Sequence, residues 1–484
     1  MNVSNMNHDR LKMGASAGAV IAVAGFVSLF ATYWDDAWHT DVGRDDAAIP
    51  PHLLLYGSVA VAGVVVLWWG LRILLATRSL PAVLHTAPVM VAAAGGAATL
   101  AAAPLDAAWH AAFGRDAVLW SPPHMLVVFA STAMVLGVIA GTRATGNGVV
   151  EALLGGLLLG GLAMVVLEYE TDVPQFSEAL YLPVLVAVTL PAGAVARRFV
   201  PLRLPVTAVV GIYVAVRLVT TAVLTLLDRS TPELPLAILG LCVLDLPRRT
   251  AVARYSAAAA GVAGLAWLAA ASGLVERSPS AVAVVAVPVI AVFAIILLAT
   301  ARRGTPVALA VTVAAVSGGW MIASAPTASA HDPGQGETVV DAQVVGASDG
   351  RGALTIDVRA RNSCEDMRPI RIVARRGGQT LTGPLRVVDR CHYTGSVQVP
   401  GKGRWFVYAE LRHGGQDLEV WLPLRADRAD TLAEDRDLYR PTEPTASSRP
   451  LQVGIGVVVY AVGLALLLVG IAVVVRDERT RAAE

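Results

Sequence analysis

The chain has 484 residues, 55% of them apolar, and its mean hydropathy is +0.60. This apolar content exceeds that of a soluble globular protein, so we expect an integral membrane protein whose main partner is the lipid bilayer. The formal net charge of +1 argues against nucleic acid as a partner, because DNA- and RNA-binding proteins usually present a basic surface.

Apolar stretches recur along the chain, and most are close to the length of about 20 residues that a helix needs to cross a bilayer. They cover residues 13–33, 53–77, 84–103, 123–142, 148–168, 178–196, 205–227, 232–247, 251–272, 279–300, 305–325 and 452–475. The shortest, 232–247, carries Asp245 and also Cys242, which we expect to be a small buried apolar residue. The pattern predicts an all-α helical membrane bundle of about twelve spans.

Basic residues fall at every second boundary between these stretches. They are Arg10 and Lys12, Arg72 and Arg78, Arg143, Arg197 and Arg198, Arg248 and Arg249, Arg302 and Arg303, and Arg476 and Arg479. Short loops that are rich in Arg and Lys usually face the cytoplasm. We therefore expect a multi-pass protein of a bacterial cytoplasmic (inner) membrane, with both termini in the cytoplasm and the intervening loops outside.

Two of the outward loops carry the same motif. The first copy reads Asp35-Asp36-Ala37-Trp38-His39, Gly43-Arg44-Asp45 and Pro50-Pro51-His52, and the second reads Asp106-Ala107-Ala108-Trp109-His110, Gly114-Arg115-Asp116 and Pro122-Pro123-His124. In both copies the aspartate and the first histidine are four residues apart, which places them on one face of a helix. The second histidine follows a double proline, where a new helix can begin.

Each copy offers one carboxylate and two imidazoles, a ligand set that suits Zn²⁺, Fe²⁺ or Cu²⁺ and leaves positions open for water, dioxygen or substrate. The predicted metal ligands are Asp35, His39 and His52 in one copy and Asp106, His110 and His124 in the other. We expect Asp45 and Asp116 to orient the imidazole N–H groups from outside the ligand set. Solvated loop charges and interfacial tryptophans could explain a single copy; the recurrence favours metal ligation.

At these residues the chain resembles the C subunit of the copper membrane monooxygenases, the particulate methane and ammonia monooxygenase family. The matching residues at that family's first copper site are Asp35, Trp38, His39, Arg44, Asp45, Pro50 and His52. The family's second site has Asn, His and His, and here Asp106 replaces the Asn beside His110 and His124. The resemblance covers roughly residues 13–180. It implies copper more strongly than oxygenase activity, and a homo-oligomer only by analogy.

The segment before the soluble region has the parts of a secretory signal peptide. Arg302 and Arg303 precede an apolar core, and Ala328-Ser329-Ala330 precedes His331. Either the helix stays uncut as a span, or a signal peptidase cuts after Ala330. Cutting would make His331 a new N-terminus whose amine and imidazole could chelate copper, with His392 or His413 completing the site.

Residues 331–446 alternate apolar and polar positions in seven or so short runs, separated by turns rich in Gly and Asp. The runs are 338–345, 353–360, 370–374, 385–388, 396–399, 405–411 and 418–422. They predict an outward β-sandwich of immunoglobulin-like or cupredoxin-like shape. This region resembles the B subunit of the same monooxygenases and equally a periplasmic copper carrier. Cys364 and Cys391 are predicted to form a disulfide, the alternative being two buried free thiols.

We therefore expect four regions: a membrane domain with the duplicated motif (1–200), further membrane helices (201–326), the sandwich (331–446) and a C-terminal anchor (451–476). Mid-span Arg217 should form a structural ion pair with Glu168, Asp228 or Asp245. Three functions fit these features: copper binding and delivery; monooxygenation of a small apolar substrate by dioxygen, with Asp106, His110 and His124 at the reactive metal; and copper transport. Transport is the weakest hypothesis because mid-span polar residues are few.

Overall fold

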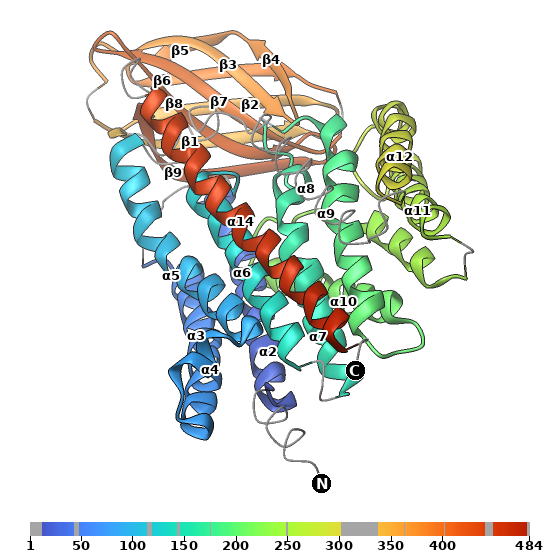
Figure 1. The fold of residues 1–484 in the computed structure, drawn as a ribbon. Coiled ribbons are helices and arrows are strands. Elements are labelled where there is room, and N and C mark those ends of the chain that lie inside the picture. The colour runs from blue at the N-terminus through green and yellow to red at the C-terminus, as the bar shows by residue number, and fades with distance from the viewer. Residues whose placement is uncertain are drawn as a thin grey trace.

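The computed structural model describes residues 12–42, 48–113, 119–142, 146–174, 176–247, 250–301, 337–362, 364–400, 402–440 and 449–481. They form a bundle of helices with an antiparallel β-sheet lying across one end of it (Figure 1).

Nine helices among the described residues are long and apolar enough to cross a membrane, so the chain is a multi-pass membrane protein. They are α2 (Ala15–Asp41), α3 (Pro50–Thr77), α5 (Ala87–Phe113), α6 (Pro122–Thr142), α7 with its continuation through α8 (Gly148–Glu170), α9 (Glu178–Phe199), α10 (Pro205–Leu226), α11 (Ala251–Ala271) and α14 (Arg449–Arg481). The short helical elements are α4 (Leu80–Leu84), η2 (Met164–Val166), α8 (Leu167–Glu170) and η3 (Leu236–Asp245). Helix α12 (Pro279–Ala301), in the predicted span 279–300, is not counted among the nine, because only its part Pro279–Phe293, which is shorter than a span, is fully described.

The number of spans in the described part of the chain is smaller than the twelve expected. The predicted span 232–247 forms only the ten-residue 3₁₀-helix η3. At about 2.0 Å of rise per residue this helix reaches about 20 Å, which is short of the hydrocarbon thickness of about 30 Å. Pro235 and Pro247 bound it, and Gly240 lets it pack closely on α11. The expected span 305–325 and the signal-like segment lie outside the described residues.

Helices α6 and α7 form the centre of the bundle and are its most buried spans. Helix α6 packs against α5 and α14, and α14 crosses in front of it (Figure 1). Helix α7 packs against α2, α9 and α10. Small residues allow these close approaches: a side chain at Gly137 of α6 would collide with the backbone of α5. One continuous apolar core joins all of these helices.

Helix α2 begins, and α14 ends, at the end of the bundle away from the sheet (Figure 1). The pairs α2–α3 and α5–α6 are antiparallel hairpins that turn at the end that carries the sheet. The aspartate and the two histidines of each motif copy lie next to these turns. Both sets therefore lie at the end of the bundle that carries the sheet.

The nine strands are β1 (Glu337–Asp349), β2 (Ala353–Ala360), β3 (Arg368–Arg376), β4 (Gln379–Gly383), β5 (Leu385–Asp389), β6 (His392–Gln398), β7 (Arg404–His413), β8 (Gln416–Arg425) and β9 (Ala429–Arg440). They form one antiparallel sheet in the order β4-β3-β7-β8-β9-β1-β2-β6-β5. The two edges of the sheet approach each other, because β4 contacts β6 and β3 contacts both β5 and β6. The β domain is therefore barrel-like.

The expected sandwich of two packed sheets is thus replaced by a single curled sheet. The local alternation correctly indicated strands, but it does not determine which strands pair. Strands β1 and β9, the first and last strands of the domain in the sequence, pair over most of their length. Apolar side chains fill the inside of the barrel, with Trp405 among the most buried of them. The Cys364–Cys391 disulfide is confirmed, with the two Cα atoms 5.5 Å apart.

Candidate metal centres

The first centre lies at the turn between α2 and α3. Asp35 and His39 project from the last turns of α2, and His52 from the first turn of α3, which begins at Pro50. The carboxylate oxygen Oδ1 of Asp35 lies 3.0 Å from Nε2 of His52 and 3.6 Å from Nε2 of His39. The end of α2 and the start of α3 thus bring the three predicted ligands together in this hairpin.

The second centre repeats this arrangement at the turn between α5 and α6. Nε2 of His110 lies 3.1 Å from Oδ2 of Asp106, and Nε2 of His124 lies 3.3 Å from Oδ1. The two imidazole rings are 6.3 Å apart between centroids, the same separation as between His39 and His52. The sequence repeat therefore corresponds to a repeat in three dimensions.

The spacing within each centre fits one ion. Two ligand atoms that each lie about 2.1 Å from a tetrahedral ion are about 3.4 Å apart, close to the 3.0–3.6 Å separations between nitrogen and carboxylate oxygen. Oδ1 of Asp35 and Oδ1 of Asp106 are buried, and each lies next to an imidazole nitrogen of its own centre, His52 and His124 respectively. A bound cation would satisfy both oxygens, which otherwise carry a desolvation cost. Within the described part of the chain, these are the two groups of three such side chains that could hold a metal.

The two centres border a common cavity of about 100 Å³. Asp35 and His39 line it from the first centre, and His124 lines it from the second. Between them the wall includes Glu168, whose side chain accepts a hydrogen bond from the backbone N–H of Leu119. Glu168 is buried, and this hydrogen bond holds the backbone at Leu119, three residues before α6 begins.

The end of α2 that carries Asp35 and His39 is held by two other parts of the chain. Asp41 accepts hydrogen bonds from the backbone N–H and the hydroxyl of Ser230, in the loop after α10. Arg436 of β9 donates a hydrogen bond of 2.6 Å to the backbone carbonyl of Asp41. The guanidinium of Arg229 lies 5.4 Å from the ring centroid of Trp38. The β domain and the loop thus fix the chain two residues beyond His39, which the sequence did not indicate.

Buried ion pairs also lie between the helices beneath the sheet. Arg217 pairs with Glu170 at 2.7 Å, a partner outside the three expected candidates. The ion pair itself was expected, but Glu170 lies at the end of a short helix whose register the sequence did not reveal. Glu233 pairs with Arg277 at 2.7 Å. Burial raises the pKa of Glu233 to about 7, even though Arg277 acts in the opposite direction.

Charged contacts also join the sheet to the bundle. Arg376 of β3 is buried and lies 3.3 Å from Oδ1 of Asp172 and 3.6 Å from Oε2 of Glu276. Arg425 of β8 contacts the same glutamate. These contacts fix the β domain over the end of the bundle that carries both centres.

The other predicted site residues that the structure describes, His392 and His413, are not brought into either centre. His392 pairs with Asp357 at 2.7 Å, and His413 ends β7; neither belongs to a three-residue metal group among the described residues. His331, Asp45 and Asp116 lie outside the described residues. The possible copper site of the β domain therefore stays a prediction.

No family model, no curated protein and no solved structure matches this chain. The resemblance to the copper monooxygenases therefore depends on the motif residues alone.

Proposed function

We propose that this chain is a copper-binding integral membrane protein with two outward-facing centres, each formed by one aspartate and two histidines. The observation that carries the proposal is the geometric repeat: two hairpins hold the same three side chains at separations that fit an ion, around a buried carboxylate oxygen. Structural ion pairs alone would not require the same three-residue set twice.

The ligand set also suits zinc and iron. Copper is proposed because the order and spacing of Asp35, His39 and His52 resemble the first copper site of the membrane monooxygenases. When bound, copper would supply a redox-active ion with coordination positions open to water or dioxygen. The chain's own contribution is to hold two imidazoles and one carboxylate in a largely buried position at the end of each hairpin.

The distribution of basic residues supports the proposed orientation. Lys12, Arg72 and Arg78 lie where α2 begins and α3 ends, at the end of the bundle opposite the centres. The positive-inside rule puts that end in the cytoplasm of a bacterial inner membrane. Both termini would then be cytoplasmic, and the β domain and both centres would face outward.

Metal content tests the proposal directly. The purified protein should retain two copper ions per chain, and His39→Ala and His110→Ala should each lower the content by one ion. His85→Ala is the matched control, because this histidine ends α4 at the other end of the bundle and its ring contacts the Pro81 carbonyl. Unchanged metal content in both centre variants would contradict the proposal.

The cavity favours a second candidate function, copper-dependent oxidation of a small apolar substrate at the second centre. His124 faces this cavity, and much of the wall beside it is apolar, including Val127, Val128 and Met164. Asp106, His110 and His124 would hold the reactive metal. The assay is dioxygen-dependent oxidation of short hydrocarbons or ammonia by copper-loaded protein supplied with a reductant. Turnover that His110→Ala abolishes and His85→Ala retains supports the enzyme. Two bound coppers without turnover leave binding and delivery as the function.

A further inference from the structure

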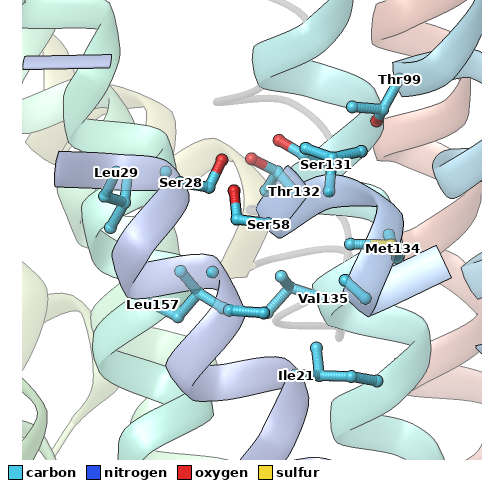
Figure 2. Close-up of a pocket in the computed structure, with 15 residues that line it drawn as sticks. Ile21, Ser28, Leu29, Ser58, Thr99, Ser131, Thr132, Met134, Val135 and Leu157 are labelled. Carbon is cyan, nitrogen blue, oxygen red and sulfur yellow. The ribbon is translucent and has the colours of Figure 1, made fainter. Parts of the chain in front are cut away.

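A second cavity lies deeper in the bundle, below the one that borders the metal centres. Five hydroxyl side chains from four helices line it, together with apolar residues, and Figure 2 shows several of them directed toward one another. We name these five the hydroxyl tier: Ser28 of α2, Ser58 of α3, Thr99 of α5, and Ser131 and Thr132 of α6.

The hydroxyl tier follows the same internal repeat as the metal ligands. Ser28 precedes Asp35 by seven residues, and Thr99 precedes Asp106 by seven. On the partner helices, Ser58 follows His52 by six residues. Ser131 follows His124 by seven. Six or seven residues are about two helical turns, or about 10 Å. The first hairpin thus carries two hydroxyls about two turns deeper than its triad, and the second hairpin carries three. The seven-residue spacings keep Ser28, Thr99 and Ser131 within about 20° of the helix face of the corresponding triad residue, whereas the six-residue spacing turns Ser58 about 120° away.

The hydroxyls present oxygen lone pairs to this cavity. Ser58 donates its proton to the Leu55 carbonyl at 2.8 Å, and Thr99 donates to the Gly95 carbonyl at 2.9 Å. Thr132 donates to the Val128 carbonyl at 2.6 Å. Their donors are used within their own helices, so the oxygens can accept hydrogen bonds from a ligand. The cavity lining contains no charged side chain, so the chemistry fits a small neutral donor.

The size and position of the cavity fit water. Its volume of about 60 Å³ holds several waters, since each needs roughly 10–15 Å³. Ser28, Leu29, Ser131 and Gly161 line both this cavity and the one at the metal centres, so the two adjoin. Ile21, Val135 and Leu157 are among the apolar residues that line the rest of it. The cavity therefore has polar positions at its hydroxyls and an apolar wall elsewhere.

We propose that the hydroxyl tier holds a cluster of water molecules that extends the metal-centre cavity about two helical turns into the bilayer. The water would solvate the inner side of both centres. Charged groups at membrane depth are expensive unless they pair or face a water-filled cavity. This hydration is a property of the chain itself and does not require that the centres bind metal.

X-ray radiolytic footprinting tests the proposal on the intact protein. Radiolysis of bound water oxidises a neighbouring methionine to its sulfoxide, which mass spectrometry detects. Met134 lines the hydroxyl-tier cavity, whereas Met125 on the same helix is fully buried and lines neither cavity. We expect Met134 to be oxidised severalfold faster than Met125, in metal-free as well as copper-loaded protein. Equal rates would overturn the proposal and would leave metal binding untouched.

Variants of the same size without a hydroxyl test whether the hydroxyls hold the water. Thr132→Val should lower the oxidation rate of Met134 severalfold, and Thr99→Val provides a second test if the first variant fails to fold. Thr142→Val is the matched control: this threonine is also buried in α6, donates to the Val138 carbonyl at 3.0 Å and lines neither cavity. A Met134 rate that stays at the wild-type level in both test variants would overturn the role of the hydroxyls.

Discussion

Replacing Arg217 by methionine tests the buried ion pairs that hold together the half of the bundle nearest the sheet. Its guanidinium pairs with Glu170 at 2.7 Å, and both side chains are 1% exposed. It also donates to the Tyr213 hydroxyl at 3.0 Å and to the Glu233 carbonyl at 2.7 Å. It lies 4.5 Å from the ring centroid of Tyr33, two residues before Asp35. The substitution would leave Glu170 buried without its cation.

Removing one partner of a buried ion pair costs about 3–5 kcal/mol, because the remaining charge stays desolvated. We expect Arg217→Met to lower the free energy of unfolding by that amount, measured by denaturant titration in detergent micelles. Adding Glu170→Gln to this variant should restore part of the loss, since the unpaired charge is then removed.

The matched control is Arg390→Met. Arg390 pairs with Glu365 at 3.0 Å, but both side chains are 81% exposed. An exposed pair of this kind contributes roughly 0–1 kcal/mol. If Arg217→Met proved as mild as Arg390→Met, or if Glu170→Gln restored no stability, the reasoning about the buried network would be refuted.

Three further predictions concern the loops and the β domain. Because burial raises the pKa of Glu233 from 4.5 to about 7, its contribution to stability is full below the lower value and is lost as pH rises through the higher one. Between pH 4.5 and about 7, the melting temperature of Glu233→Gln should therefore fall less with rising pH than that of the wild type. An equal fall in both proteins would contradict the raised pKa of Glu233. Arg436→Ala removes the donor to the Asp41 carbonyl, so copper affinity should fall at the first centre and not at the second, as isothermal titration would show; equal losses would indicate a general folding defect. Replacing Cys364 and Cys391 by Ser should cost the β domain about 3.5 kcal/mol by the loop-entropy relation for a sequence separation of 27, whereas Cys242→Ser should leave the melting of this domain unchanged.

The local features of this fold were predictable from the sequence. Hydropathy found each of the nine long helices, because a bilayer demands about 20 apolar residues whatever their partners. The grouping of each aspartate with two histidines was predictable as well, since Asp35 and His39 share a helix face and Pro50 starts the next helix. Both features depend on residues close together in the chain.

Long-range contacts were not predictable in the same way. Alternating residues indicated strands but not the pairing of β1 with β9, which closes one curled sheet in place of a sandwich. The partner of Arg217 depends on the short helix α8, whose register places Glu170 beside it. The hydrogen bond from Arg436 to the Asp41 carbonyl joins residues that are far apart in the sequence.

The hydroxyl tier lies between these two cases. Its spacing from the metal ligands can be read in the sequence, yet single mid-span serines and threonines are unremarkable alone. Helical membrane segments often satisfy such hydroxyls by back-bonding to their own carbonyls. Their convergence became visible only when four helices were placed around one cavity.

The central claim is that two hairpins each hold one metal ion between an aspartate and two histidines. Anomalous scattering from crystals of the copper-loaded protein, recorded on both sides of the copper absorption edge, tests it most directly. We predict one peak among Asp35, His39 and His52 and a second among Asp106, His110 and His124. Copper peaks elsewhere in the molecule, with neither triad occupied, would contradict the account.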